Sequence, residues 1–183
     1  MEHLGTKELI TDRLILRKLK IEDAENVFKN WTNDDNVTEY LSWPTHKDID
    51  STKHVLNNWI KKYENKDFYL WGIVLKDINE PIGTISVVGN SDKEKIVRIG
   101  YCIGKKWWKK GITTEAFKRI IEYFFMEVGI NRIEAKHVTG NENSGKVMMN
   151  CGLKYEGLMK QEHLCNKGLL DTKNYAILKE DYN

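Results

Sequence analysis

The chain has 183 residues, of which 40% are hydrophobic and 31% are charged, and its formal net charge is +2 at pH 7. We expect one globular domain over residues 1–183, because this length and composition suffice for a single full core. The small net charge argues against a nucleic-acid partner, and no apolar run is long enough to span a membrane. The chain shows no signal-peptide pattern and its three cysteines are widely spaced, so we expect a cytoplasmic protein with reduced thiols.

The first third of the chain predicts one strand followed by helices. Residues 13–19 alternate between apolar and basic side chains in the manner of a strand. Residues 22–31 and 49–63 repeat apolar side chains at steps of three and four, which predicts two helices. Between them the Asp34-Asp35-Asn36 cluster marks a break, and an irregular segment follows at 37–44.

The remaining elements follow in regular succession. Runs of β-branched and aromatic residues predict strands, and helical spacing with Asn or Gly at the ends predicts two further helices. The expected elements are strands at 68–75, 81–88 and 96–103, a helix at 113–128, a strand at 132–138, a helix at 141–151, and strands at 153–159 and 175–178. The polar segment 162–170 is expected to be a loop. The order β-α-α-β-β-β-α-β-α-β-β predicts a mixed α/β fold with about six to seven strands and about four helices.

The joint between the strand at 96–103 and the helix at 113–128 has the character of an anion site. The first turn of a helix carries N–H groups without partners and a partial positive charge. Gly111 allows a phosphate to approach the backbone, and Lys109 and Lys110 add two full charges. Neither a G-x-x-x-x-G-K-[ST] run nor a G-x-G-x-x-G run occurs at this joint. A solvated loop in front of an amphipathic helix is the alternative interpretation.

Trp108, Gly111 and Thr113 occupy the positions of a Q/R-x-x-G-x-G/A motif, of which only the central glycine matches. In these residues the chain resembles the GNAT superfamily of acyl-CoA N-acyltransferases. The tryptophan together with the run G-x-x-T-E-A resembles the RimJ/RimL-type ribosomal-protein branch of that family. The order of elements is also that of the GNAT fold, whose central sheet is mostly antiparallel. The resemblance implies acetyl-CoA as co-substrate, an amine as acceptor and no metal ion.

The resemblance also implies which residues hold acetyl-CoA. The joint would take the pyrophosphate, the end of the preceding strand would take the pantetheine arm, and the N-x-x-S stretch at 141–144 would contact the arm again. Gly100 in that strand indicates either a bulge with close backbone approach or simple core packing. The implied cofactor-binding residues are Tyr101, Cys102, Ile103, Trp108, Lys109, Lys110, Gly111, Ile112, Thr113, Thr114, Asn141 and Ser144.

Acetyl transfer requires a proton for the departing thiolate. Many GNAT enzymes place a tyrosine four residues after the serine of N-x-x-S, but this chain has Met148 there, which has no proton to give. We therefore expect Ser144 to be the acid, with hydrogen bonding at the helix start as its alternative role. Cys102 is expected to be a core thiol rather than a nucleophile, and His137 to be structural or to lie at the rim of the groove.

The expected acceptor is a protein or peptide N-terminal amine. An α-amine with a pKa of about 8 is roughly a tenth neutral at pH 7, so it needs little help from a base, and Glu39 is a possible water-linked base. The acceptor site is expected to be lined by Tyr40 and Trp43 and bordered by Trp31, Trp59 and 162–170. The alternatives are a small amine such as a polyamine, amino acid or antibiotic, or a CoA-binding sensor without activity. The protein is expected to be a monomer or a homodimer.

Overall fold

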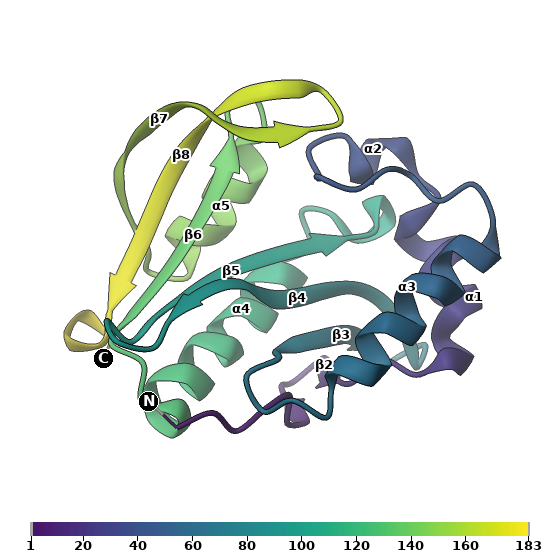
Figure 1. The fold of residues 1–183 in the computed structure, drawn as a ribbon, viewed down its shortest axis with the longest axis horizontal. Helices are drawn as coiled ribbons and strands as arrows, with labels where there is room; N and C mark the ends of the chain where they lie inside the picture. Colours follow the sequence, from purple (N-terminus) through teal and green to yellow (C-terminus); the bar gives the residue numbers. More distant parts are fainter. Residues whose placement is uncertain (1, 183) are drawn as a thin grey trace.

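The computed structural model describes residues 2–182, which form an eight-stranded sheet with helices on both faces (Figure 1). The strands are β1 (Leu9–Ile10), β2 (Leu14–Arg17), β3 (Leu70–Leu75), β4 (Glu80–Ser91), β5 (Ile96–Ile103), β6 (Arg132–Val138), β7 (Lys154–Cys165) and β8 (Gly168–Leu178). The helices are α1 (Ala24–Val27), α2 (Asp35–Thr38), α3 (Ile49–Lys62), α4 (Ile112–Tyr123) and α5 (Glu142–Asn150). The strand order is β1-β2-β3-β4-β5-β6-β8-β7, and within the described sheet every neighbouring pair except β5–β6 is antiparallel.

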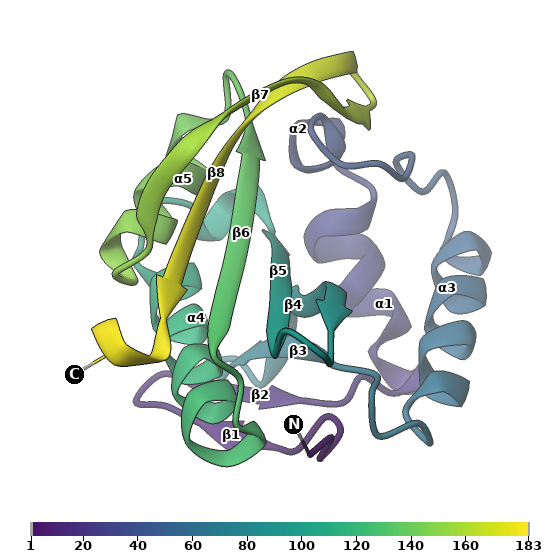
Figure 2. The same ribbon diagram turned by 60° about the vertical axis from the view of Figure 1, so that its left-hand side comes forward.

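Helices α1 and α3 cover one face of the sheet, and α4 and α5 cover the other (Figures 1 and 2). Helix α4 turns Ala116, Phe117 and Ile120 toward the sheet, and all three are fully buried in the larger core. The smaller core lies under α1 and α3 and contains Trp31, which is also fully buried. Packing on both faces makes the sheet a rigid support for the residues at its edges.

The parallel pair β5–β6 holds together at one end only. Pairing joins Ile96–Arg98 to Arg132–Glu134, whereas β5 continues to Ile103 and β6 to Val138. Within the described strands, the later residues face one another without a ladder, and the two strands diverge in Figure 1. Along the edges that face each other, the divergence leaves backbone N–H and C=O groups of both strands without a strand partner, although β4 and β8 still pair with their outer edges.

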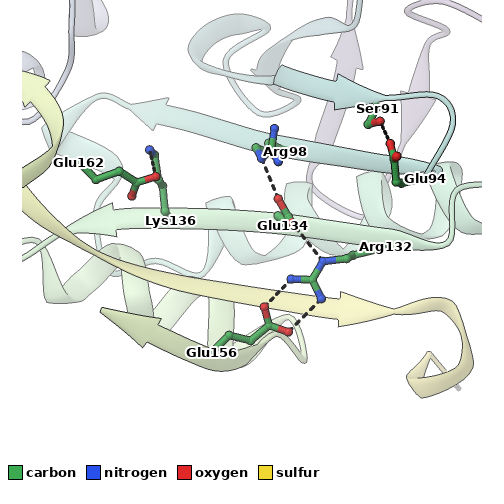
Figure 3. Close-up of polar contacts among 8 residues, drawn as sticks. All are labelled: Ser91, Glu94, Arg98, Arg132, Glu134, Lys136, Glu156 and Glu162. Carbon is green, nitrogen blue, oxygen red and sulfur yellow. Dashed lines mark hydrogen bonds and ion pairs between the residues drawn. The ribbon is translucent and has the colours of Figure 1, made fainter. Parts of the chain in front are cut away.

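A row of charged side chains bridges the strands where this pairing ends (Figure 3). Arg98 Nε lies 2.7 Å from one carboxylate oxygen of Glu134, and Arg132 Nε lies 2.7 Å from the other. Arg132 also donates to Glu156 of β7, with Nη1 2.9 Å from Oε1. The hydrogen bond to Glu156 is the main reason that the pKa of Arg132 lies above its ordinary value. The row therefore ties β5, β6 and β7 together at the narrow end of the divergence.

The predicted fold class and the order of its elements are confirmed, with two corrections to the count. The sheet has eight strands rather than six or seven, because β1 has only two residues and shows no alternation. There are five helices rather than four in the described chain, because the side chain of Asp34 accepts a hydrogen bond from Asn36 N and caps the short α2. The helix expected at 22–31 is a helical segment that begins as a 3-10 turn and ends as a π turn around α1. One domain over 1–183 stays a prediction, and residues 1 and 183 lie outside the described chain.

The prediction of a loop at 162–170 is wrong. Strands β7 and β8 continue through it as one long hairpin that is paired as far as Cys165 with Gly168, so that residues 166–167 form the turn. Most of β7 is exposed, so its sequence lacks the apolar alternation that marks a half-buried strand. None of the helices within residues 2–182 combines the length and apolar character that crossing a membrane requires.

Candidate active site

A cavity of about 860 Å³ lies where β5 and β6 diverge. It extends from the loop before α4, past the first turn of α5, to the segment after α2 and the β7–β8 hairpin. The site residues predicted from sequence that line it are Tyr40, Trp43, Tyr101, Cys102, Ile103, Trp108, Lys109, Lys110, Gly111, Ile112, Thr113, Thr114, Asn141 and Ser144. Residues far apart in the chain thus meet around one space.

One end of the cavity is the loop that leads into α4. Gly111 is the N-cap residue with φ of +72°, a left-handed conformation that favours glycine, and Lys109 has φ of +60°. No side chain within residues 2–182 caps α4, so the N–H groups of its first turn are open to an anion. Lys109 and Lys110 are exposed beside this turn, and Trp108 Nε1 donates to the carbonyl of Ile103 at 2.8 Å. Open N–H groups and two ammonium groups fit a pyrophosphate.

The same loop is anchored from outside the cavity by the β1–β2 turn. Arg13 Nε lies 2.6 Å from Glu115 Oε2, and Arg13 Nη1 donates to the carbonyl of Lys110 at 3.0 Å. Thr11 Oγ1 also donates to Glu115, at 2.6 Å. Burial tends to raise the pKa of Glu115, but the hydrogen bonds prevail and hold it below its ordinary value of 4.5. The ionised carboxylate thereby fixes the start of α4.

The middle of the cavity lies between the unpaired edges of β5 and β6. Asn141 is the N-cap residue of α5, but its side chain makes no capping hydrogen bond within the described residues, so its amide is available to a ligand. Gly100 makes room for the β4 bulge, because a Cβ there would lie 2.8 Å from Val88 Cγ1. Free strand edges and an uncommitted amide suit an extended arm that carries amide groups of its own.

Ser144 lines this middle part from the first turn of α5. Its Oγ lies 2.9 Å from the hydroxyl oxygen of Tyr101. Met148, one turn later, is 1% exposed and packs in the larger core, so its side chain does not line the cavity. Two hydroxyl groups, rather than one, can therefore donate hydrogen bonds in this part of the cavity.

Two other lining residues carry reactive side chains. Cys102 Sγ lies 3.3 Å from Thr84 Oγ1, and burial raises the pKa of its thiol, which disfavours the thiolate that a covalent mechanism requires. His137 is 4% exposed, and its Nδ1 lies 2.9 Å from the carbonyl oxygen of Val138, to which it donates. Its Nε2 has no hydrogen-bond partner among residues 2–182. His137 is therefore a largely buried residue of the cavity lining.

The other end of the cavity is its mouth. Tyr40 and Trp43 line it from the segment after α2, whereas Lys136 of β6 and His163 of β7 line it from the C-terminal strands. The sequence prediction missed Lys136, whereas His163 lies within the segment 162–170 that was expected to border the acceptor site. The sequence does carry a signal for Lys136, because it alternates with the apolar core residues of β6.

Asn166 at the tip of the hairpin joins the two sides of the mouth. Its backbone N–H donates to the carbonyl of Leu41 at 3.1 Å, and its Nδ2 lies 2.8 Å from the carbonyl oxygen of Thr38 and 2.9 Å from that of Trp43. The hairpin is thus fastened to the N-terminal part of the chain by Asn166, and the neighbouring turn residue Lys167 adds an ion pair with Glu39. Trp31 and Trp59 pack in or against the smaller core and do not line the cavity.

Glu39 lies outside the main cavity and lines a separate one of about 400 Å³. Its carboxylate forms an ion pair with Lys167, and this hydrogen bond raises the pKa of Lys167. The structure therefore does not bring Glu39 together with Ser144. Asp34 and Asp35 are likewise absent from the lining of the main cavity. Asp34 instead caps the start of α2.

The charge of the main cavity is of one sign. The lysines that line it are Lys109, Lys110, Lys136 and Lys146. Within residues 2–182 its lining contains no aspartate or glutamate. No group of three His, Cys, Asp or Glu side chains in the same part of the chain could hold a metal ion. The cavity is therefore suited to anionic ligands at its lysine-lined positions.

The start of α4 can accept phosphates and the wedge between β5 and β6 can accept an extended arm, so the cavity fits the co-substrate of an acyl-CoA-dependent transferase. Residues 13–154 match the family model described as acetyltransferase (GNAT) domain. The chain therefore belongs to the GNAT acetyltransferase family, whose members use acetyl-CoA, and it is an N-acetyltransferase. The predicted family and co-substrate are confirmed.

Relatives cover nearly the whole chain. An uncharacterized N-acetyltransferase of Bacillus subtilis, YoaA, is 33% identical over 171 residues, which are 93% of this chain and 96% of that protein. The [ribosomal protein uS5]-alanine N-acetyltransferase of Escherichia coli is 26% identical and is covered to 92%, with 95% of this chain matched. A crystal structure of a GNAT-family acetyltransferase from Bacillus anthracis has 27% identity and a TM-score of 0.83, and the match covers 95% of this chain and 99% of that one.

Proposed function

We propose that this enzyme acetylates the N-terminal α-amine of a protein or peptide, by direct attack of the amine on acetyl-CoA in a ternary complex. The observation that carries the proposal is the charge of the cavity, whose lining within residues 2–182 has four lysines and no carboxylate. A polyamine or an aminoglycoside would bring several positive charges against these lysines, and the adjoining carboxylate of Glu162 is already paired with Lys136 at 3.0 Å. A peptide N-terminus brings a single amine, which is neutral when it attacks.

The proposal assigns three tasks to the lining. Lys109, Lys110 and the first turn of α4 after Gly111 hold the phosphates, because charge and open N–H groups meet there. The backbone of residues 101–103 and the amide of Asn141 hold the pantetheine arm. Tyr40 and Trp43 shape the mouth through which the amine enters.

The proposal includes no protein base. An α-amine has a pKa of about 8, so roughly a tenth of it is neutral at pH 7 without assistance. Glu39 is occupied by Lys167 outside the cavity, so we leave it out of the catalytic set. The uS5-alanine N-acetyltransferase of Escherichia coli, which matches nearly all of this chain, is named for an acceptor of the same kind and so supports the proposal.

The experiment compares kcat/KM, from the release of free thiol, for matched acceptors. The acceptors are a short lysine-containing peptide with a free N-terminus, the same peptide with a blocked N-terminus, free alanine and spermidine. We expect the free N-terminus to exceed the others by tenfold or more. A preference for the blocked peptide or spermidine overturns the acceptor assignment. Thermal stabilisation by acetyl-CoA without thiol release from any acceptor indicates a sensor instead.

A further inference from the structure

The side chain of Tyr101 reaches from β5 to the first turn of α5. Its hydroxyl oxygen lies 2.9 Å from Ser144 Oγ and 2.9 Å from the Ser144 carbonyl oxygen. Its ring packs against Phe117 of α4, with ring centroids 5.7 Å apart. Tyr101 and Ser144 both line the cavity. A serine hydroxyl that could rotate freely is thus held by a phenol whose own position is fixed by packing.

Two hydroxyl hydrogens are shared among three oxygens at this contact. The carbonyl oxygen of Ser144 can only accept, whereas each hydroxyl can donate once. When Tyr101 donates to the carbonyl, the serine hydrogen can point to the phenol oxygen instead of into the cavity. When Tyr101 donates to Ser144 Oγ, the serine hydrogen is free for a ligand. A negative charge that develops in the cavity favours the second arrangement.

Neither hydroxyl is suited to give its proton away completely. Burial raises the pKa of Tyr101 far above its ordinary value, although the hydrogen bond with Ser144 acts in the opposite direction. An alcohol such as Ser144 is also a weaker acid than a thiol, whose ordinary pKa is about 8.5. Transfer of either proton to a thiolate is therefore unfavourable, whereas hydrogen-bond donation to it is favourable.

We propose that Tyr101 is a positioning residue for acetyl transfer: it donates to Ser144 Oγ, and Ser144 donates to the sulfur of coenzyme A as negative charge develops there. This inference rests on the proposed function, because it requires the acetyl thioester to lie in this cavity. The amine nitrogen bonds to the acetyl carbonyl carbon, and the C–S bond breaks with its electron pair going to sulfur. The surplus proton on nitrogen leaves through solvent and neutralises the thiolate. Both hydroxyls keep their hydrogens throughout.

The pair supplies a hydroxyl where position 148 of the helix offers none. Position 148 carries a methionine buried in the core. The phenol instead comes from β5 and acts through the serine, and a donor that accepts a hydrogen bond is itself the stronger donor. The chain of two hydroxyls is therefore expected to stabilise the leaving sulfur more than Ser144 alone.

Tyr101→Phe tests the inference, because it keeps the ring and removes one hydroxyl. We expect kcat to fall about threefold to tenfold, the range of one hydrogen bond, while KM for acetyl-CoA is unchanged. The double variant Tyr101→Phe/Ser144→Ala is expected to match Ser144→Ala alone, because the phenol acts only through the serine. Tyr123→Phe is the control, since it removes a buried phenol that donates to the carbonyl of Gly5 at 2.8 Å, away from the cavity, and should leave kcat unchanged.

Three results overturn the inference: wild-type kcat in Tyr101→Phe, a rise in KM alone, or losses that multiply in the double variant. A measurement on the wild type covers the case in which Tyr101→Phe does not fold. The kcat of the wild type, measured as a function of pH, should not fall up to about pH 9.5, because neither hydroxyl loses its proton in that range. A fall of kcat in that range would indicate an acid that transfers its proton, and would overturn the inference. If the wild type is active and Tyr101→Phe has the same kcat, only this inference is contradicted. If the wild type releases no thiol with any acceptor, the proposed function is contradicted.

Discussion

Arg13 and Glu115 are 102 residues apart in the chain, and their side chains meet with Arg13 Nε 2.6 Å from Glu115 Oε2. The contact joins the β1–β2 turn to the first turn of α4. It fixes the start of this helix from outside and leaves the N–H groups of the first turn free. The pair therefore supports the proposed anion site without being part of its lining.

Loss of this pair is expected to weaken the binding of acetyl-CoA. Arg13→Gln and Glu115→Gln should each raise the dissociation constant several-fold, because each leaves the loop before α4 less firmly held, while kcat changes little. Arg119→Gln, which breaks an exposed pair with Glu122 elsewhere on α4, is the matched control. Isothermal titration with coenzyme A checks the result. Tighter binding by Glu115→Gln would contradict it, because removal of a negative charge would then be the dominant effect.

Gly111→Glu is expected to abolish the binding of coenzyme A. The substitution places a carboxylate at the open turn and a side chain at φ of +72°. Gly129→Glu is the matched control, because Gly129 ends the same helical segment with φ of +80° and has no atom within 4 Å of its Cβ position. Thermal shift with increasing coenzyme A checks both variants. Equal shifts for wild type and Gly111→Glu would show that the phosphates bind elsewhere.

Ser144→Ala is expected to lower kcat about 10²-fold, the typical cost of removing a donor to developing charge. The dissociation constant for acetyl-CoA should hardly change, because the hydroxyl is needed only as the C–S bond breaks. Steady-state kinetics together with a binding measurement separate the two effects. A fall in kcat of twofold or less would show that Ser144 only forms hydrogen bonds at the start of α5.

Gly145→Ala is expected to destabilise the fold and to displace His137. A Cβ at Gly145 would lie 2.6 Å from His137 Nε2, so the buried imidazole would have to leave its position. Overpacking of this kind costs about 1–3 kcal/mol in the free energy of unfolding. Met149→Ala, an exposed position on the same helix, should change it by less than about 0.5 kcal/mol. Urea unfolding of both variants checks the difference.

Stability is expected to fall in acid through Asp23. Burial tends to raise the pKa of Asp23, but hydrogen bonds from Arg17, at 2.8 and 2.9 Å, and from Lys20 N hold it below its ordinary value of 3.8. A carboxyl with a lowered folded pKa stabilises the protein above its unfolded pKa and stops doing so as the pH falls through the folded pKa. Unfolding between pH 6 and 2 should show this loss. Asp23→Asn should be less stable near neutrality and less sensitive below pH 3.8.

The parts of the fold that could be predicted are those with periodic burial. Helix α4 and strand β5 have apolar faces that their sequences display directly, and the glycine at their joint signals its conformation. β7 could not be predicted in the same way, because its side chains are exposed on most positions and its pairing with β8 is made by the backbone. Exposure removes the apolar contrast on which the prediction of a strand depends.

The site divides along a similar line. Lys109, Gly111 and Ser144 stand in short local motifs, so the sequence places them beside the cavity. The partnership of Tyr101 with Ser144 joins residues 43 positions apart, and no spacing rule indicates that a strand phenol reaches a helix serine. Glu39 was predicted from its position near the expected mouth, but its carboxylate pairs with Lys167. Lys167 lies in the turn of a hairpin for which the sequence predicts a loop, so the pairing could not be foreseen.

The fastening of Asn166 to the segment after α2 makes the molecule a closed frame. Strand pairing and the row around Glu134 shut the frame at one end, and the three hydrogen bonds of Asn166 shut it at the other. A frame closed at both ends must break one of these contacts to open around a ligand, whereas a chain end can enter without breaking them. For the acceptor proposed above, this predicts that a polypeptide end enters more easily than a lysine in mid-chain, from which the backbone continues in both directions.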